Sequence, residues 1–196
     1  MLRRRASFLG KMALEVAYAC LEGRSGVPTV FCSRHGEVAR AVALLQDLVR
    51  GEPLSPTAFG MSVHNAIAGM LTIARSDQAN HIALAAGAGS VEHAVIEACG
   101  LLADGEPQVL LIVCDSALPD LFARFEDCDE QPHAWAWLMT PAAADAMTLN
   151  WCASELAATA TSRMPAGLEV ARFHLGGAAS MERCDGRLRW LWSRDA

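Results

Sequence analysis

HIALAAGAGSVEHAVIEACGLLADGEPQVLLIVCD, residues 81–115, is the stretch that decides the fold. It opens on residues 81–86, which are typical of a strand, and passes through a tight glycine turn at residues 87–89. Apolar side chains then recur at helical spacing from Val91 to Leu102, with Ser90 as the expected N-cap. Val109–Asp115 is apolar on both faces, which predicts a central strand of a covered sheet.

The flanking segments continue the alternation of helices and strands. Helices are predicted at residues 7–22, 38–49 and 63–74, the last with Ser62 as N-cap; strands are predicted at 27–32, 134–140, Glu169–Leu175 and Arg187–Trp192; a loop is predicted at Ser55–Met61. In the last of these strands two tryptophans alternate with arginines, so one face is expected to be apolar. This order of elements predicts a layered α/β domain.

Composition excludes several classes of protein. The 196 residues are 53% hydrophobic and 19% charged, which is enough apolar material for a large core and argues against disorder. The net charge of −6 predicts no basic face, so we expect no nucleic-acid partner. No apolar run approaches the roughly 20 residues of a membrane span, and a charge interrupts any signal-peptide core. We therefore expect a cytoplasmic protein with no membrane span.

No motif for metal, cofactor or triad chemistry is complete. The seven cysteines are widely spaced and lack a C-x-x-C pair, and the six histidines lack an i, i+4 pair, so no metal site is expected. The turn at 87–89 lacks the third glycine of a dinucleotide loop, because Glu92 stands there, so no cofactor is expected. Ser90 and His93 are interpreted as a helix cap and an ordinary helix histidine, and Arg34-His35 as either surface residues or a local hydrogen-bonding loop.

Several segments resemble β-ketoacyl synthases. In SPTAFGMSVHNAIAG, residues 55–69, a Ser-Pro loop leads into an Asn-x-x-Ala-Gly helix, as in that family. Residues 83–98 resemble the family's strand, nucleophile turn and helix, and 101–115 the helix end and strand that follow. The runs SRHGE at 33–37 and SVHNA at 62–66 are similar to a subgroup, the chain-length factors found with aryl polyene and related pigment pathways.

The resemblance covers about residues 3–140 and implies a fold. This fold is the N-terminal half of a thiolase-like fold, a layered αβα arrangement with a mixed sheet. The predicted domain organisation is a ketosynthase-like half over 1–140 and a divergent C-terminal extension, 141–196, packed on it. The strand with which ketosynthases begin is not seen ahead of the first predicted helix.

The resemblance also implies that catalytic residues are missing. In ketosynthases the nucleophilic cysteine follows the helix glycine by 19 residues; counted from Gly69, that position is Ala88, and His93 matches the family's helix histidine. Alanine cannot form a thioester. After residue 140 the only histidine is His174, and no lysine follows Lys11, so the residues for malonyl decarboxylation are also missing. No catalytic residue is therefore expected.

The expected function lies in a partner. The resemblance implies a heterodimer with an active ketosynthase subunit, and an acyl carrier protein reached through that subunit. The residues expected to gate the partner's acyl tunnel are Ala58, Phe59, Met61 and Ser62, with His64 and Asn65 at the interface. Two alternatives stay open: an independent acyltransferase or thioesterase using Cys99, Cys114 or Ser90, and a purely structural stabiliser of the ketosynthase.

Overall fold

The structure is a computed structural model that describes residues 4–143, 146–154 and 163–194. Its elements, in chain order, are α1 (Phe8–Leu21), β1 (Thr29–Cys32), α2 (Val38–Val49), α3 (Pro56–Gly60), α4 (Ala66–Arg75), β2 (His81–Leu84), η2 (Gly87–Gly89), α5 (Ser90–Ala103), β3 (Val109–Asp115), η3 (Asp120–Phe125), β4 (His133–Met139), β5 (Met147–Ala153), α6 (Ala166–Leu175), β6 (Ser180–Cys184) and β7 (Leu188–Arg194). None of the helices in these ranges combines the length and apolar character that a membrane crossing requires.

Two sheets organise the chain. The first has the order β2-β1-β3-β4, in which β1 is parallel to both β2 and β3, while β4 runs antiparallel to β3. The second is the antiparallel sheet β5-β7-β6. The first sheet is therefore mixed, as predicted.

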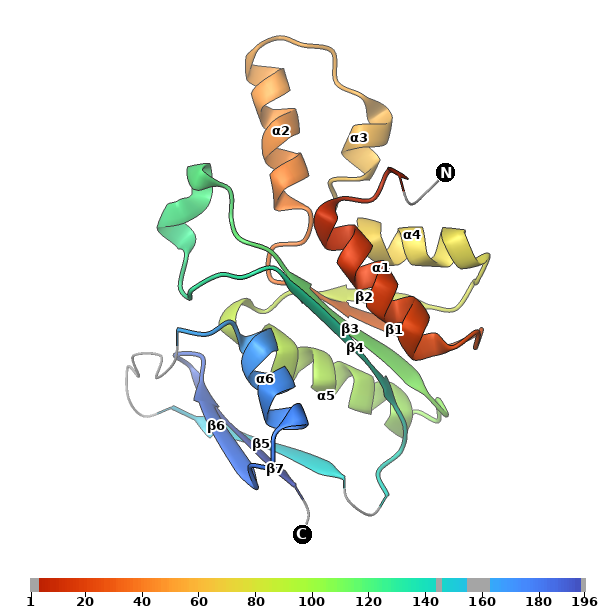
Figure 1. The fold of residues 1–196 in the computed structure, drawn as a ribbon, viewed down its shortest axis with the longest axis vertical. Coiled ribbons are helices and arrows are strands. Elements are labelled where there is room, and N and C mark those ends of the chain that lie inside the picture. Colours follow the sequence, from red (N-terminus) through yellow and green to blue (C-terminus); the bar gives the residue numbers. More distant parts are fainter. Residues whose placement is uncertain (1–3, 144–145, 155–162, 195–196) are drawn as a thin grey trace.

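The elements form layers (Figure 1). Helices α1 and α4 cover one face of the first sheet, where they pack on Phe31, Leu110 and Ile112. Helices α5 and α6 cover the other face, where Val109 and Leu111 point. Alternate side chains of β3 thus enter two different cores, which confirms the prediction of a central strand covered on both sides.

The second sheet lies over the far side of α5 and α6. Trp192 of β7 is fully buried in the same core as these helices, and Met147, Leu149 and Met181 pack against that core. The C-terminal residues therefore add a further layer to the molecule. The predicted alternation in the last strand is confirmed, because Trp190 and Trp192 are buried while Arg189 and Leu191 are exposed.

One predicted strand is wrong. The segment 169–175, expected as a strand, belongs to helix α6, whose N-cap is Pro165. Its buried residues Ala166, Glu169, Val170 and Phe173 recur at spacings of three and four, which is the period of a helix and not of a strand. A short apolar run is compatible with either element, and the layer in which it packs decides between them.

The predicted loop at 55–61 and two predicted caps also need correction. Pro56–Gly60 forms the short helix α3, in which the hydroxyl of Ser55 accepts a hydrogen bond from the Ala58 amide. The Ser62 hydroxyl donates to the carbonyl of Phe59, and α4 begins only at Ala66. Ser90 is the first residue of α5 and not its N-cap.

A buried ion-pair cluster joins three elements of two layers. The guanidinium of Arg183, on β6, pairs with Glu92 on α5 and donates to Glu169 Oε2 on α6 at 2.6 Å. The Arg183 side chain is 8% exposed. Removing one partner of such a buried pair leaves uncompensated charge in a low dielectric, which costs far more than losing a surface pair.

We predict that Arg183→Met lowers the free energy of unfolding by about 3–5 kcal/mol, because it leaves the carboxylates of Glu92 and Glu169 buried without their cation. The matched control is Arg189→Met on the neighbouring strand, where the side chain is 57% exposed and lies 3.7 Å from Glu182. That change should cost less than about 1 kcal/mol. Chemical denaturation of both variants measures the difference, and equal losses would contradict the role of the buried cluster.

Candidate functional site

The site is built around the turn that connects β2 to α5. Ala88 is the middle residue of this turn, η2, and α5 begins two residues later. A thiol at a helix N-terminus is held more easily as a thiolate, because the helix dipole and free amides favour negative charge there. The methyl group of Ala88 offers no such nucleophile. Its carbonyl oxygen instead accepts a hydrogen bond from Arg183 Nη2 at 3.5 Å.

The C-terminal strands cover this turn. The Oδ2 of Asp185 accepts from the indole of Trp190 at 3.0 Å, and its Oδ1 accepts from the amides of Arg187 and Leu188. Partial burial raises the pKa of Asp185, but the three hydrogen bonds outweigh it and hold the pKa below its ordinary value. A Cβ at Gly89 would lie 2.5 Å from Asp185 Oδ2, so only glycine allows this approach.

The His93 side chain contacts the backbone of the turn and the C-terminal strands. Its Nδ1 lies 2.8 Å from the carbonyl oxygen of Gly89, and its ring packs edge to face on Trp190 with 5.2 Å between centroids. The ring is thus held by the backbone and by the C-terminal strands. These contacts give His93 a structural role in the packing of the turn.

The other candidate nucleophiles are poorly placed. The hydroxyl of Ser90 is buried, donates to the carbonyl of Gly87 and accepts from the amide of Ala86. Cys114 is fully buried, and burial, with a smaller contribution from Asp115, raises its pKa well above the ordinary value. Cys99 is exposed at the surface, but neighbouring atoms partly desolvate its thiol, and this desolvation raises its pKa. A raised pKa lowers the fraction of reactive thiolate.

The residues expected to gate a partner's tunnel lie on and just after α3. Phe59 is 65% exposed and points away from the core, whereas Met61 is half-buried and packs against the core under α1 and α4. Ala58 and Met61 also line a shallow groove of about 400 Å³, which Arg4, Arg5 and Arg40 border. Phe59 and Ser62 are not part of the lining of this groove, so the structure does not bring the four expected gate residues to one site.

His64 and Asn65, the expected interface residues, face different ways. His64 Nε2 lies 2.7 Å from the carbonyl oxygen of Ser33, and the ring packs against Phe31. His64 thus links the segment after α3 to the end of β1. Asn65 is exposed just before α4.

The Arg34-His35 pair forms a local polar cluster, which is one of the two interpretations drawn from the sequence. Arg34 pairs with Asp127 and lies 3.8 Å from Glu130, which His35 also approaches. Asp115 accepts from the Ser33 hydroxyl and the Arg34 amide; burial raises its pKa, although these hydrogen bonds oppose the shift. Within the described ranges, no group of three or more His, Cys, Asp or Glu side chains could hold a metal ion.

Sequence reasoning missed the set that packs on the turn. The set consists of charged residues from three separate segments, and the sequence around each one is typical of a solvent-exposed side chain. They are Glu92, Glu169, Arg183 and Asp185. The alternation in residues 187–192 was the one signal that a buried strand lies nearby. The pairing of these charges depends on tertiary contacts between residues up to 91 positions apart in the sequence.

Comparison with known proteins identifies the family. The profile of the family described as "Beta-ketoacyl synthase, N-terminal domain" matches residues 1–193. The chain is similar to one chain of a solved complex from Xenorhabdus doucetiae, which contains a ketosynthase (ApeO) and its chain length factor (ApeC): the TM-score is 0.87 at 27% identity, over 97% of this chain and 79% of that one.

A second solved structure shares only the fold. It is a β-ketoacyl synthase from Burkholderia phymatum, with a TM-score of 0.54 at 12% identity, over 65% of this chain and 35% of that one. A search of curated proteins finds no match. The expected thiolase-like α/β fold is confirmed, and the chain belongs to the β-ketoacyl synthase N-terminal domain family.

Proposed function

We propose that this chain is a non-catalytic, cytoplasmic chain-length factor that forms a heterodimer with an active ketosynthase and shapes its acyl tunnel. The observation that carries the proposal is Ala88, which stands at the helix-terminal turn where the family's nucleophile is expected. The similar complex from Xenorhabdus contains a ketosynthase and a chain length factor, which supports the same assembly for this chain. The acyl carrier protein would be bound by the ketosynthase subunit.

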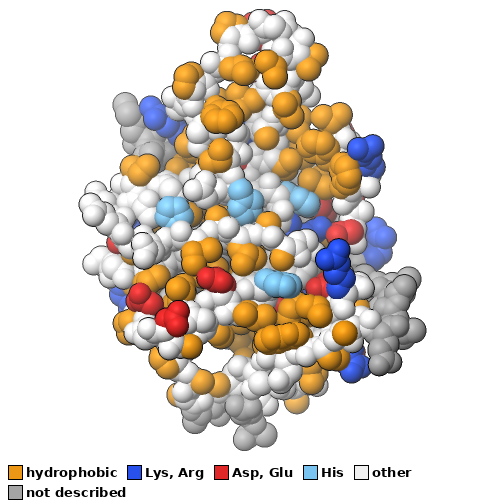
Figure 2. All heavy atoms as spheres, turned by 180° about the vertical axis from the view of Figure 1, so that it is seen from behind, with side chains coloured by type: hydrophobic (Ala, Val, Ile, Leu, Met, Phe, Trp, Pro, Cys, Tyr) orange, Lys and Arg blue, Asp and Glu red, His pale blue; other side chains and the backbone are white. Residues whose placement is uncertain are grey.

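A surface suited to a partner lies on the α2–α3 arm, residues 38–60. Side chains that would normally be buried are exposed on or next to it: Leu45, Leu48, Val49, Leu54, Phe59 and Val63. Figure 2 shows hydrophobic side chains gathered over this upper end of the molecule. A contiguous exposed apolar patch of this kind is typical of a protein interface.

The outer strand of the first sheet supports pairing as well. β2 lies at the edge of that sheet, and its second edge pairs with no strand among residues that the structure describes. An open strand edge presents unpaired backbone groups that another chain can bind. The strand leads directly into the turn with Ala88, so a partner on this edge would lie close to it.

Phe59 and Met61 would act as stops in the partner's tunnel. Phe59 projects from the arm, while Met61 fixes the base of α3 on the core. A tunnel end made of large apolar side chains resists compression, because protein interiors are densely packed. A chain-length limit then follows from how far Phe59 reaches into the partner.

We predict that Phe59→Ala and Met61→Ala, each co-expressed with the ketosynthase, yield longer products, because Phe59→Ala removes volume at the tunnel end and Met61→Ala loosens the base of the helix that carries Phe59. Chromatography and mass spectrometry of the products measure the length. The control is Leu175→Ala at the end of α6, where an equally apolar side chain is 85% exposed but lies on another element. Phe59→Ala should shift the free energy of unfolding by no more than about 0.5 kcal/mol, because the side chain is exposed.

The same experiment separates the proposal from a purely structural role. If the ketosynthase is soluble only with this chain and yet all three variants give products of unchanged length, the chain is a stabiliser and the tunnel role is wrong. Co-purification with the ketosynthase tests the heterodimer itself, whatever the product length.

We predict that the purified chain acquires no acyl group when it is incubated with an acyl carrier protein thioester. Ala88 has no nucleophile, and burial raises the pKa of Cys99 and Cys114. Intact-mass spectrometry measures the result, with an active ketosynthase as positive control. An added acyl mass that disappears in Cys99→Ser or Cys114→Ser would support the alternative of an independent acyltransferase.

A further inference from the structure

A large pocket lies at the opposite end of α5 from the turn with Ala88. It has a volume of about 900 Å³ and is bounded by the second half of α5, the end of β4, the start of β5 and the end of α6. This volume falls within the roughly 300–1,000 Å³ typical of small-molecule sites. Cys99 is ten residues beyond Gly89, which corresponds to about 15 Å along a helix, so the pocket is separate from the turn.

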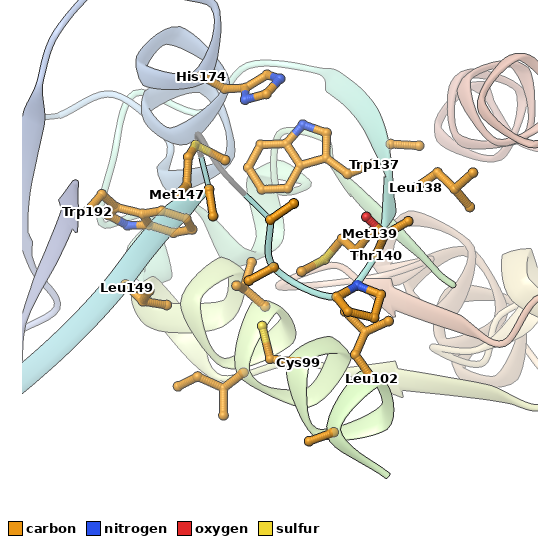
Figure 3. Close-up of a pocket in the computed structure, with 18 of the residues that line it drawn as sticks. Cys99, Leu102, Trp137, Leu138, Met139, Thr140, Met147, Leu149, His174 and Trp192 are labelled. Atoms are coloured by element: carbon orange, nitrogen blue, oxygen red, sulfur yellow. The ribbon is translucent and has the colours of Figure 1, made fainter. Parts of the chain in front are cut away.

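The lining of the pocket is apolar and aromatic. Figure 3 shows Trp137 of β4 and Cys99 of α5 pointing into it, with Trp192, Met147 and Leu149 on one side. The floor reaches Trp192, which is almost completely buried, so the pocket is a recess into the core and not a flat surface patch. Recesses of this shape enclose most of a small ligand, whereas exposed side chains on a convex arm meet a protein partner.

His174 is the one titratable nitrogen base in the described lining, which holds no Lys, Arg, Asp or Glu side chain. Burial lowers the pKa of His174, and the nearby charge of Arg194 lowers it further, so the ring is neutral at neutral pH. A charged ligand would lose its hydration here without gaining an opposite charge. The lining therefore favours an uncharged ligand, for which the His174 ring and the Thr140 hydroxyl offer hydrogen bonds.

The walls are aromatic, and their rings are tilted by 54° between Trp137 and His174 and by 74° between Trp137 and Trp192. The Trp137 ring lies 4.9 Å from the His174 ring and 6.5 Å from the Trp192 ring, measured between centroids. Sulfur atoms of Cys99, Met139 and Met147 complete the lining, and polarisable sulfur makes favourable contacts with aromatic rings. Aromatic rings and sulfur together make favourable contacts with an apolar ligand.

We propose that this pocket binds an uncharged, apolar small molecule, as a second site independent of the contact with a ketosynthase. The probe that tests it is 1,6-diphenylhexatriene, a neutral conjugated hydrocarbon whose fluorescence rises in apolar surroundings. Titration of the full chain should give saturable binding of one probe per chain. The propionic acid derivative of the probe should bind at least tenfold more weakly at neutral pH, because its carboxylate has no cationic partner in the lining.

Two cysteine variants locate the binding. Cys99→Phe places a ring in the pocket from the exposed face of α5 and should weaken probe binding at least tenfold. The matched control is Cys152→Phe, an equally exposed cysteine on β5 that is not part of the lining, and it should bind as the unchanged chain does. Bound probe should also slow alkylation of Cys99 and leave that of Cys152 unchanged.

Three results would overturn the proposal. Non-saturating binding would mean general hydrophobic adsorption. Equal effects of Cys99→Phe and Cys152→Phe, in chains whose thermal unfolding is unchanged, would place the probe elsewhere. Absence of probe binding together with loss of ketosynthase co-purification in Cys99→Phe would make the pocket a protein contact.

Discussion

The buried guanidinium of Arg183 is the interaction on which the arrangement of this molecule depends. A cation removed from water must be matched by opposite charge, and here Glu92 and Glu169 supply it from α5 and α6. Because Arg183 itself lies on β6, the match holds the second sheet against the two helices. The same guanidinium donates to the carbonyl of Ala88, so the turn and the C-terminal strands form one packed unit.

This packing has a consequence for the chemistry of the turn. Asp185, Trp190 and His93 occupy the space around it. The Trp190 indole donates to Asp185 and packs on the His93 ring, and a ring nitrogen of His93 lies within hydrogen-bond distance of the Gly89 carbonyl. The turn therefore keeps the geometry of a helix-terminal site while its middle residue is an alanine and its surroundings are filled by this chain's own side chains. A role exercised through the exposed α2–α3 arm, as we propose, requires nothing of this turn except that it hold β2 and α5 in place.

The two surfaces with functional potential lie at different ends of the molecule. The α2–α3 arm is convex and exposes large apolar side chains, which suits contact with another protein. The pocket beside Cys99 is concave and reaches the buried Trp192, which suits a small ligand. Cys99 lies about 15 Å from the turn along α5, and no residue of the arm lines the pocket, so an occupant of the pocket need not disturb a partner at the arm.

The sequence by itself determined the first sheet, most of its covering helices and the alanine at position 88. Those features follow from local periodicity and from a count along the chain, and residues 81–115 carry both. Only the tertiary structure decided that residues 169–175 are helical, that 56–60 form a helix, and that the last residues make a second sheet. A run of seven residues with mixed burial fits either period, and the helix prevails because Val170 and Phe173 enter the core beside α5. The charge cluster and the pocket could not be predicted from the sequence, because each exists only where segments that are distant along the chain meet.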